Sequence, residues 1–435
     1  MDDLWVVLPH LGAGGAQKVG LLAAEHFAQQ GMTVRVVSLR PDHPVRHRVP
    51  DCVALLNLDL SSTSEQLHPW LRDSDNRALH ARARRFSVAQ LIKLRRGCLR
   101  LITLLLLQGV QLILPWIDRR VQPGRGGGLT ALLHYCMGSF GGLRYVRLRQ
   151  LLRERRPRRV LALLSKTNIL CCAAAWDLPI HLVVSERNDP RLQVMDPLWR
   201  RLRRIYYRRA DVVTANTEGV LRALRGMGHW TRLELLPNPL PAGVLRDDSA
   251  PSDQRRSEEV LAVARLVPQK GLDLLIRAFA ALPESLRSGW RLTLVGDGPE
   301  RQALSDLAQT SGIADRVVFE GFRSDPAVFM ARASIFALPS RFEGMPNALL
   351  EAMAAGLPSV VSDASPGPLE MVSDAVHGLV VPKEDHGAFA KALQTLMADP
   401  QMRQRLGGAA REKLRSLDWP EVEPHWRSVL ALPSS

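Results

Sequence analysis

Short apolar runs alternate with helical patterns along most of the chain, and this alternation limits the fold more than any other feature of the sequence. The chain opens with an apolar run at Leu4 to Leu8. A glycine-bearing turn, an amphipathic segment from Gln17 to Gln30 and a second apolar run at Thr33 to Leu39 follow. Strand, helix and strand in this order form a βαβ unit, and repeated units build a parallel sheet covered by helices. The sequence therefore predicts an α/β fold.

The length of the chain and a break near its middle predict two such units. A chain of 435 residues exceeds what one ordinary hydrophobic core holds. A polar, proline-bearing stretch from Pro237 to Asp253 has no helix or strand period and reads as a linker. We expect two Rossmann-like doubly wound domains, at residues 1–240 and 254–418. A final helix, 419–435, either packs back on the first domain or is a simple terminal helix.

Positive charge is concentrated in the first half of the chain. Residues 1–240 hold 37 Lys and Arg against 18 Asp and Glu, whereas residues 241–435 hold 21 against 25. Residues 77–159 alone contain 19 basic residues and two acidic ones, Asp118 and Glu154. Such a stretch requires an anionic partner or surface, so we interpret 77–159 as a basic, membrane-facing insertion in the first domain.

The apolar segment 98–117 within this insertion allows three interpretations. Arg100 and Pro115 interrupt it, and basic residues flank it on both sides, which favours a helix lying at an anionic headgroup layer. A membrane-spanning helix and a core helix beside a solvated basic neighbour are the alternatives. The five scattered cysteines and the acidic start without a signal-peptide pattern predict a cytoplasmic protein, peripheral on the inner face of the cell membrane.

Two motifs in the second half carry the candidate chemistry. Arg265 and Lys270 follow a strand and enter the loop before the next helix, where ligands of parallel sheets bind. Glu343 follows another strand, Pro346 opens a helix and Glu351 lies inside it among apolar residues. Cations, free amides of a helix amino end and two carboxylates suit a nucleotide diphosphate sugar.

These residues, together with Gly296 to Pro299 and Gly356 to Pro358, make the chain resemble the C-terminal domain of family 4 glycosyltransferases. The turn Gly12 to Gln17 is similar to the glycine loop that opens those enzymes. The resemblance implies the GT-B fold and transfer with retention of anomeric configuration.

The resemblance also implies a role for each matching residue. Arg265 and Lys270 would bind the diphosphate and Glu343 the donor sugar, and these three are the predicted catalytic residues. The remaining predicted donor-binding residues are Gly14, Gly15, Gly296, Gly344, Met345, Pro346, Asn347 and Glu351, of which Glu351 would hold the ribose hydroxyls.

The acceptor side departs from the family pattern, because no histidine stands at the strand ends where many relatives carry one. We expect the cluster after a later strand to face the acceptor; its members are Glu186, Arg187, Asn188 and Asp189. Simple loop capping is the alternative for this cluster. His10 and His134 are possible substitutes for the missing histidine, and the group that takes the acceptor proton stays open.

The predicted function is transfer of a sugar, with UDP as the expected nucleotide, to a lipid-linked saccharide in cell-surface glycan biosynthesis. No cofactor or metal ion is expected, and the nucleotide sugar is a co-substrate. A GT-B epimerase that acts on the donor alone is the alternative. A basic nucleic-acid-binding protein is a remote one, because the cations are not interleaved with the aromatic residues that stack on bases.

Overall fold

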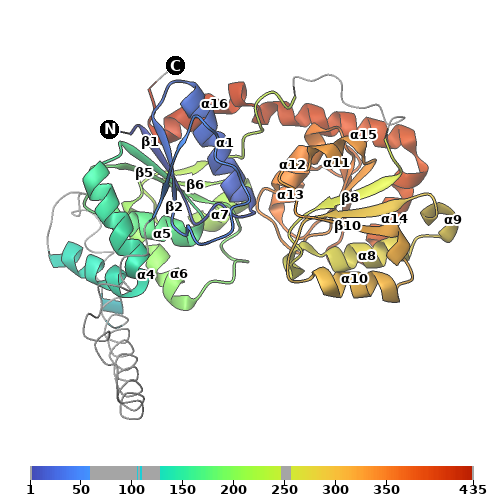
Figure 1. The fold of residues 1–435 in the computed structure, drawn as a ribbon, viewed down its shortest axis with the longest axis horizontal. Coiled ribbons are helices and arrows are strands. Elements are labelled where there is room, and N and C mark those ends of the chain that lie inside the picture. The colour runs from blue at the N-terminus through green and yellow to red at the C-terminus, as the bar shows by residue number, and fades with distance from the viewer. Residues whose placement is uncertain (1, 59–104, 106–107, 110–127, 246–255, 434–435) are drawn as a thin grey trace, which may run out of the picture.

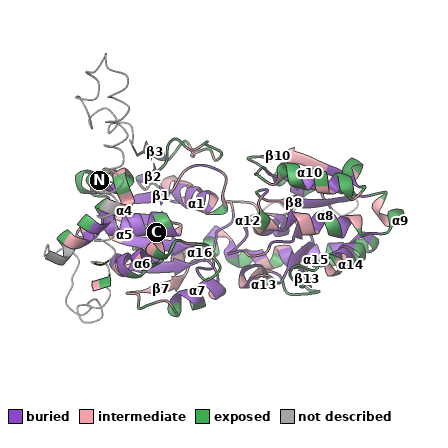
Figure 2. Ribbon diagram, turned by 90° about the horizontal axis from the view of Figure 1, so that it is seen from below, coloured by how far each residue is buried: buried purple, intermediate pink, exposed green. Residues whose placement is uncertain are grey.

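The computed structural model describes residues 2–58, 105, 108–109, 128–245 and 256–433. Within them the chain forms two α/β domains that lie side by side (Figure 1). Each domain is a parallel sheet between layers of helices. The central strands are buried, whereas the edge strands β3, β7 and β10 are mostly intermediate or exposed (Figure 2). The two Rossmann-like domains predicted from the alternating pattern are therefore confirmed.

The first domain contains a seven-stranded sheet among its described residues, with the strand order β3-β2-β1-β4-β5-β6-β7. The strands are β1 (Leu4–Leu8), β2 (Val34–Ser38), β3 (Ala54–Asn57), β4 (Arg159–Leu163), β5 (His181–Glu186), β6 (Val212–Ala215) and β7 (Leu233–Leu235). The helices are α1 (Gly15–Gln29), α4 (Gly128–Arg155), α5 (Ser165–Ala174), α6 (Pro197–Tyr206) and α7 (Glu218–Arg225), with the 3-10 turn η2 (Tyr207–Arg209). From β1 the sheet grows in one direction through β2 and β3 and in the other through β4 to β7. Ligands of such sheets bind at the point where the strand order reverses, here between β1 and β4.

The central strand β1 is buried on both faces, as its unbroken apolar run predicts. Successive side chains of a strand point to opposite faces. Val6 packs in the core that α1 covers, whereas Trp5 and Val7 pack in the core that α4 and α5 cover. The predicted strand Leu4 to Leu8 is confirmed residue for residue. β1 thus fixes the position of the glycine turn that follows it.

Part of the expected membrane-facing insertion is an ordinary helix of this domain. α4 bends at Gly142, where φ is 58° and ψ is −150°, and buries Leu133, Met137 and Leu148 against the sheet and α5. Arg149 forms an ion pair of 2.7 Å with Asp177 at the end of α5, which lowers the pKa of that carboxyl to about 2. This part of the basic stretch therefore supports the fold of the first domain.

The interpretations of segment 98–117 fall almost wholly outside the described residues, as do 59–97 and 118–127. In the part of the chain that the structure describes, no helix combines the length and the apolar character needed to cross a membrane.

The second domain contains a six-stranded sheet with the order β10-β9-β8-β11-β12-β13 in its described residues. The strands are β8 (Glu259–Val263), β9 (Arg291–Val295), β10 (Val317–Gly321), β11 (Ile335–Leu338), β12 (Ser359–Ser362) and β13 (Gly378–Val381). The helices are α8 (Leu272–Ala280), α9 (Glu284–Arg287), α10 (Arg301–Thr310), α11 (Ala327–Arg332), α12 (Asn347–Ala354), α13 (Pro366–Met371), α14 (His386–Ala398) and α15 (Pro400–Lys413). Three 3-10 turns are η4 (Pro268–Lys270), η5 (Ala314–Arg316) and η6 (Leu414–Leu417).

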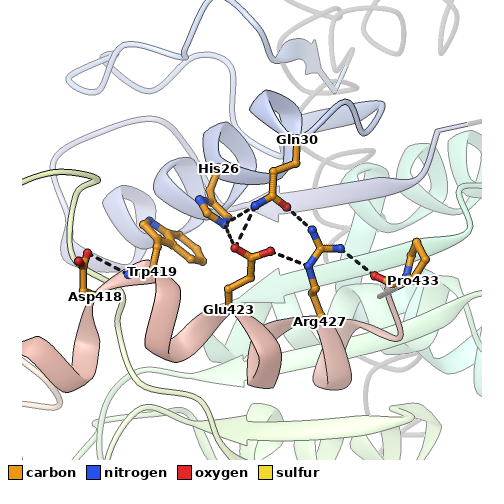
Figure 3. A network of polar contacts seen from close by, with 7 residues as sticks. All are labelled: His26, Gln30, Asp418, Trp419, Glu423, Arg427 and Pro433. Carbon is orange, nitrogen blue, oxygen red and sulfur yellow. Dashed lines mark hydrogen bonds and ion pairs between the residues drawn. The ribbon is translucent and has the colours of Figure 1, made fainter. Parts of the chain in front are cut away.

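The last helix, α16 (Trp419–Leu430), returns to the first domain and lies against α1 (Figure 3). The Trp419 ring stacks on His26 with centroids 3.7 Å apart and planes at 3°. Glu423 is the centre of the polar contacts, 2.9 Å from His26 Nε2 and from Gln30 Nε2 and 2.6 Å from Arg427 Nε. The C-terminal helix therefore ties the end of the second domain to the helix that begins at the glycine turn.

Candidate active site

A cleft of about 820 Å³ separates the two domains at the carboxyl ends of both sheets. Its lining includes all three predicted catalytic residues and every predicted donor-binding residue. These are Arg265, Lys270, Glu343, Gly14, Gly15, Gly296, Gly344, Met345, Pro346, Asn347 and Glu351. Residues more than 300 positions apart in the chain thus meet in one place, because the carboxyl ends of parallel strands gather their loops at one edge.

Lys270 and Glu343 form an ion pair in the cleft, with Nζ 2.5 Å from Oε1. Glu343 is only 6% exposed and accepts a second hydrogen bond of 2.7 Å from Ser340. Its backbone N–H donates to the Ser365 hydroxyl at 2.8 Å. A buried carboxylate needs hydrogen-bonding partners of this kind. These contacts hold the Glu343 carboxylate in a fixed orientation, and its partner Lys270 lines the cleft beside it.

Arg265 follows β8 and is exposed in the cleft. Its guanidinium makes no hydrogen bond or ion pair within the described parts of the chain, so it is free to take an anion. The neighbouring loop lies close behind it, because a Cβ on Gly296 would stand 1.8 Å from the Ala264 carbonyl oxygen. Gly296 also has a φ of 147°, which L side chains rarely adopt. The glycine lets the loops after β8 and β9 pack together beneath Arg265.

The amino ends of α12 and α1 meet across the cleft. Asn347, the first residue of α12, donates 2.8 Å to the Gly15 carbonyl of α1 and accepts from Asn238 of the first domain. Neither helix has a side-chain cap or an acidic residue in its first turn. Helix amino ends carry free N–H groups and partial positive charge. Both ends are therefore suited to an anion between the domains.

Glu351 of α12 forms an ion pair of 2.7 Å with Lys18 of α1. The side chains are 16% and 29% exposed, so the pair lies at the edge of the cleft. The carboxylate expected to hold ribose hydroxyls therefore has a cation of the first domain as its partner in this structure. Lys18 was not among the predicted site residues, although it follows directly on the glycine loop that ends at Gln17.

Three histidines line the first-domain wall of the cleft: His10, His43 and His47. His10 Nδ1 accepts from the Gly12 N–H at 3.0 Å, and burial together with nearby cations lowers the pKa of His10 to about 4. The sequence identified His10 as a possible substitute for the missing acceptor-side histidine, but His43 and His47, in the loop after β2, were not among the predicted residues. The dense run of Arg and His in residues 40–48 is the signal that could have found them.

The predicted acceptor cluster divides between cleft and core. Arg187 and Asn188 line the cleft, but Glu186 and Asp189 do not. Glu186 ends β5, and alternation of side chains along the strand turns it into the core, where Ser165 and Tyr207 donate to it and burial raises its pKa. The expected placement of Glu186 at the cleft is therefore not observed.

Two other residues considered for the acceptor side also lie elsewhere. Asp189 forms an ion pair of 2.6 Å with Arg191 in its own loop, as the loop-capping alternative supposed. His134 belongs to α4, where Nδ1 lies 2.6 Å from the Tyr145 hydroxyl, and it does not line the cleft. Both side chains serve local structure in the first domain.

Arg187 is a buried cation without an acidic partner in the described residues. Its Nη1 donates 2.6 Å to Asn238 Oδ1, and burial lowers the pKa of this arginine to about 9. A Cβ on Gly344 would stand 2.0 Å from the Arg187 carbonyl oxygen. At Gly344 and Arg187 the backbones of the two domains therefore lie close together.

The described ranges contain no group of three or more His, Cys, Asp or Glu side chains able to hold a metal ion.

Comparison with known proteins assigns both halves of the chain. Residues 247–413 match the family model described as "Glycosyl transferases group 1". Residues 108–239 match the model described as "Glycosyl transferase 4-like domain". The first match spans β8 to α15 of the second domain. The second spans α4 to β7, so β1, the glycine turn, α1, β2 and β3 of the first domain lie outside both matches.

Two curated relatives illustrate the range of similarity. The lipopolysaccharide core biosynthesis glycosyltransferase LpsE of Rhizobium meliloti is 35% identical over 211 residues, or 48% of this chain and 60% of LpsE. A Campylobacter jejuni enzyme is 26% identical over 288 residues, or 66% of this chain and 78% of its own. It is named as an α-1,4-N-acetyl-D-galactosaminyltransferase acting on an undecaprenol-diphosphate-linked saccharide. The chain thus spans about 60% of the length of LpsE.

Among solved structures, HepE of Anabaena in complex with UDP and glucose superposes with a TM-score of 0.69. The match covers 99% of this chain and 100% of HepE at 18% identity. At this identity the likeness establishes the fold alone, in which two Rossmann-like domains face a central cleft.

Proposed function

We propose that this chain, whose two domains are glycosyltransferase domains in the GT-B fold, transfers a sugar from a nucleotide diphosphate sugar to a lipid-linked saccharide. One observation carries the proposal. Arg265, Lys270 and the amino end of α12 face the amino end of α1 across a single cleft. Two cations and two uncapped helix ends form a site for a diphosphate.

UDP is the proposed nucleotide. HepE, which shares the fold over the whole chain, was solved with UDP. A thermal-shift comparison of UDP, GDP and ADP tests the base, because a ligand that binds only the folded state raises the melting temperature with concentration. We expect a shift with UDP at concentrations where GDP and ADP give none. A larger increase in melting temperature with GDP than with UDP would identify GDP as the nucleotide of the donor, and the proposed class of reaction would stay the same.

The reaction we propose retains the anomeric configuration. The acceptor hydroxyl oxygen bonds to the anomeric carbon on the face from which the nucleotide diphosphate leaves. The carbon–oxygen bond to the phosphate breaks with its electron pair on the leaving phosphate, which also receives the hydroxyl proton. Arg265 and Lys270 stabilise the charge on the diphosphate, Glu343 orients the donor sugar, and Glu351 exchanges Lys18 for the ribose hydroxyls. Preorganised charges of this kind are commonly the largest catalytic term.

Substitution of the charged pair tests this assignment. Removing one stabilising donor typically lowers kcat about 100 to 1,000-fold. We expect such losses in Lys270→Ala and Glu343→Ala, measured as UDP release with a lipid-linked glycan extract as acceptor. Lys391→Ala is the matched control, since Lys391 is exposed on α14 and outside the cleft. Full activity in both cleft variants would exclude this site.

The acceptor is proposed to be lipid-linked, which agrees with the name of the Campylobacter relative. We further propose that residues 77–159 bring the protein to an anionic, inner-face membrane surface as a peripheral protein. Each basic residue near such a surface contributes about 1 kcal/mol, and salt screens the attraction. Sedimentation with vesicles rich in phosphatidylglycerol should therefore show binding at low salt and release at high salt. Absence of binding at low salt would remove the membrane proposal.

We propose that no metal ion takes part, since Arg265 and Lys270 supply the positive charge that a bound cation would otherwise provide. Activity should then be unchanged by EDTA, and a loss that Mg²⁺ or Mn²⁺ restores would contradict this. The epimerase alternative finds no support among the three relatives described above, and product analysis tests it directly. An epimerase would convert the donor without any acceptor.

A further inference from the structure

The first-domain wall of the cleft carries a group of basic side chains that the proposed donor site does not use. This histidine–arginine wall consists of His10, His43, Arg46 and His47, all of which line the cleft. His10 follows β1, and the other three belong to the loop between β2 and β3. They face the second domain, where the proposed donor-binding cations Arg265 and Lys270 lie.

Hydrogen bonds fix this wall in place. The backbone N–H groups of Arg46 and His47 both donate to the Leu11 carbonyl, at 2.9 and 3.0 Å. His47 Nε2 lies 3.3 Å from the Gly14 nitrogen and 3.2 Å from the Gly14 carbonyl oxygen. The rings of His10 and His43 stack with centroids 3.7 Å apart and planes at 6°. The loop is thus anchored to the glycine turn in several places and forms a preorganised surface.

The wall has basic groups and no acidic partner. Within the described residues none of its four side chains forms an ion pair, and Arg46 is exposed with its guanidinium 5.0 Å from the centre of the Phe322 ring. The carboxylates of Glu343 and Glu351, which share the cleft, are already paired with lysines. The neighbouring cations also help burial to lower the pKa of His10 to about 4. An anion entering this part of the cleft would find the uncompensated positive charge of Arg46 beside the ring N–H groups of the histidines.

We propose that the histidine–arginine wall is a phosphate subsite for the acceptor, so that the enzyme selects acceptors carrying a phosphate or diphosphate near the reacting hydroxyl. The inference rests on the proposed function and adds the chemical class of the acceptor. The wall belongs to the first domain, whereas the donor cations belong to the second. Two phosphate groups, one on each substrate, can therefore be bound on opposite sides of one cleft. Arg46 binds the acceptor phosphate through its guanidinium, and the histidines donate ring N–H groups beside it.

Binding measurements with the donor site filled test the subsite. Inorganic pyrophosphate is titrated by calorimetry into the full chain saturated with UDP. Hydrogen bonds to charged groups contribute about 1.5 to 3 kcal/mol, so Arg46→Ala should weaken pyrophosphate binding about 10 to 100-fold. Arg48→Ala is the control, because Arg48 lies two residues along the same loop, outside the cleft lining, and pairs with Asp51. We expect less than a twofold change in the control and no change in UDP affinity in either variant.

Two results of this titration would overturn the subsite. Pyrophosphate that fails to bind once UDP is present would show a single phosphate site. An Arg46→Ala variant that loses UDP affinity as strongly as pyrophosphate affinity would assign the wall to the donor. Arg46 is exposed, and equal melting temperatures of the two variants verify that folding is intact.

Turnover with three acceptors of one sugar identifies the source of the phosphate: a long-chain alkyl diphosphate sugar, a lipid-free sugar phosphate and an uncharged alkyl glycoside. If the enzyme prefers the alkyl diphosphate sugar and Arg46→Ala abolishes this preference, the phosphate belongs to a lipid diphosphate. The same result with the lipid-free sugar phosphate supports a phosphorylated saccharide. Equal turnover of the uncharged glycoside overturns the subsite. Failure of the proposed function is distinct from all of these, since the wild type would then bind no nucleotide and transfer to none.

Discussion

The two walls of the cleft hold their charges differently. On the second domain, Lys270 and Glu343 satisfy one another, so a ligand that binds Lys270 must exchange partners with Glu343; only Arg265 beside them is unpaired within the described residues. On the first domain, Arg46 and the histidines beside it have no acidic partner in the described residues. Sites whose charges are paired at rest keep a fixed geometry without ligand, whereas uncompensated cations attract anions from a distance. We infer that the paired carboxylate of the second-domain wall orients the proposed donor, and that the first-domain wall attracts the proposed acceptor.

The close contact between Gly344 and Arg187 should be the most sensitive place in the cleft. Gly344→Ala places a Cβ 2.0 Å from the Arg187 carbonyl oxygen, so the domains cannot meet as they do here. Misplacement of about 1 Å can cost about 100-fold in rate, and we expect kcat/KM to fall at least that far with the fold intact. Gly408→Ala is the control, because nothing lies within 4 Å of a Cβ at that position.

Turnover by Gly344→Ala within a few fold of the wild type would contradict the view that the two walls act together through this contact. The donor and acceptor walls would then not need this contact in order to act together. Circular dichroism and melting curves of both glycine variants separate such a result from a change in folding.

The ion pair between Lys18 and Glu351 allows the two walls to be separated by substitution. If Glu351 serves the ribose, Glu351→Gln should raise KM for the nucleotide sugar about tenfold, since hydrogen bonds to charged groups contribute about 1.5 to 3 kcal/mol. Lys18→Met removes only the resting partner and should leave KM within about threefold. Steady-state kinetics at saturating acceptor measure both. Equal increases in KM would mean that the donor requires the pair itself.

The donor wall was predictable because its residues occur in two continuous motifs at strand ends, where chain order fixes their position. Lys270, Glu343 and Asn347 accordingly line the cleft as expected. The histidine–arginine wall could not be predicted in the same way, because Arg46 and His47 lie on a loop without helix or strand period. Tertiary contacts bring that loop to the cleft: its backbone donates to Leu11, His47 contacts Gly14 and His43 stacks on His10.

Side-chain direction at strand ends was the second limit of prediction. Glu186 and Arg187 are neighbours in sequence, yet only Arg187 lines the cleft, because the extended chain turns adjacent side chains to opposite sides. The docking of α16 had two open interpretations for a related reason. Tryptophans in a terminal helix predict burial but do not identify the surface that buries them, and the stacking of Trp419 on His26 is a tertiary contact.

The contact of α16 with α1 should affect stability more than chemistry. Glu423→Ala leaves His26, Gln30 and Arg427 without their shared acceptor, and we expect a loss of about 1 to 2 kcal/mol in the free energy of unfolding. Urea denaturation measures the loss. Glu421→Ala, an exposed position on the same helix, should cost less. A Glu423→Ala protein as stable as the control would show that the buried apolar side chains of α16 hold the helix without this polar network.

The smallest expected effect is on the pH dependence of stability, and it distinguishes the acceptor wall from its surroundings. The pKa of His10 is lowered to about 4 in the folded protein, chiefly by burial. The unfolded chain therefore binds the extra proton between about pH 6.5 and 4, and stability falls as pH falls through that window. The carboxyl of Asp177, with its pKa lowered to about 2, loses its contribution only at lower pH. Melting curves at pH 7, 6 and 5 should thus slope less steeply for His10→Gln than for the wild type or for His229→Gln, which changes an exposed position. If stability depends on pH equally in the wild type and in His10→Gln, then protonation of His10 does not destabilise the fold. Burial and the neighbouring basic groups would in that case not lower the pKa of His10.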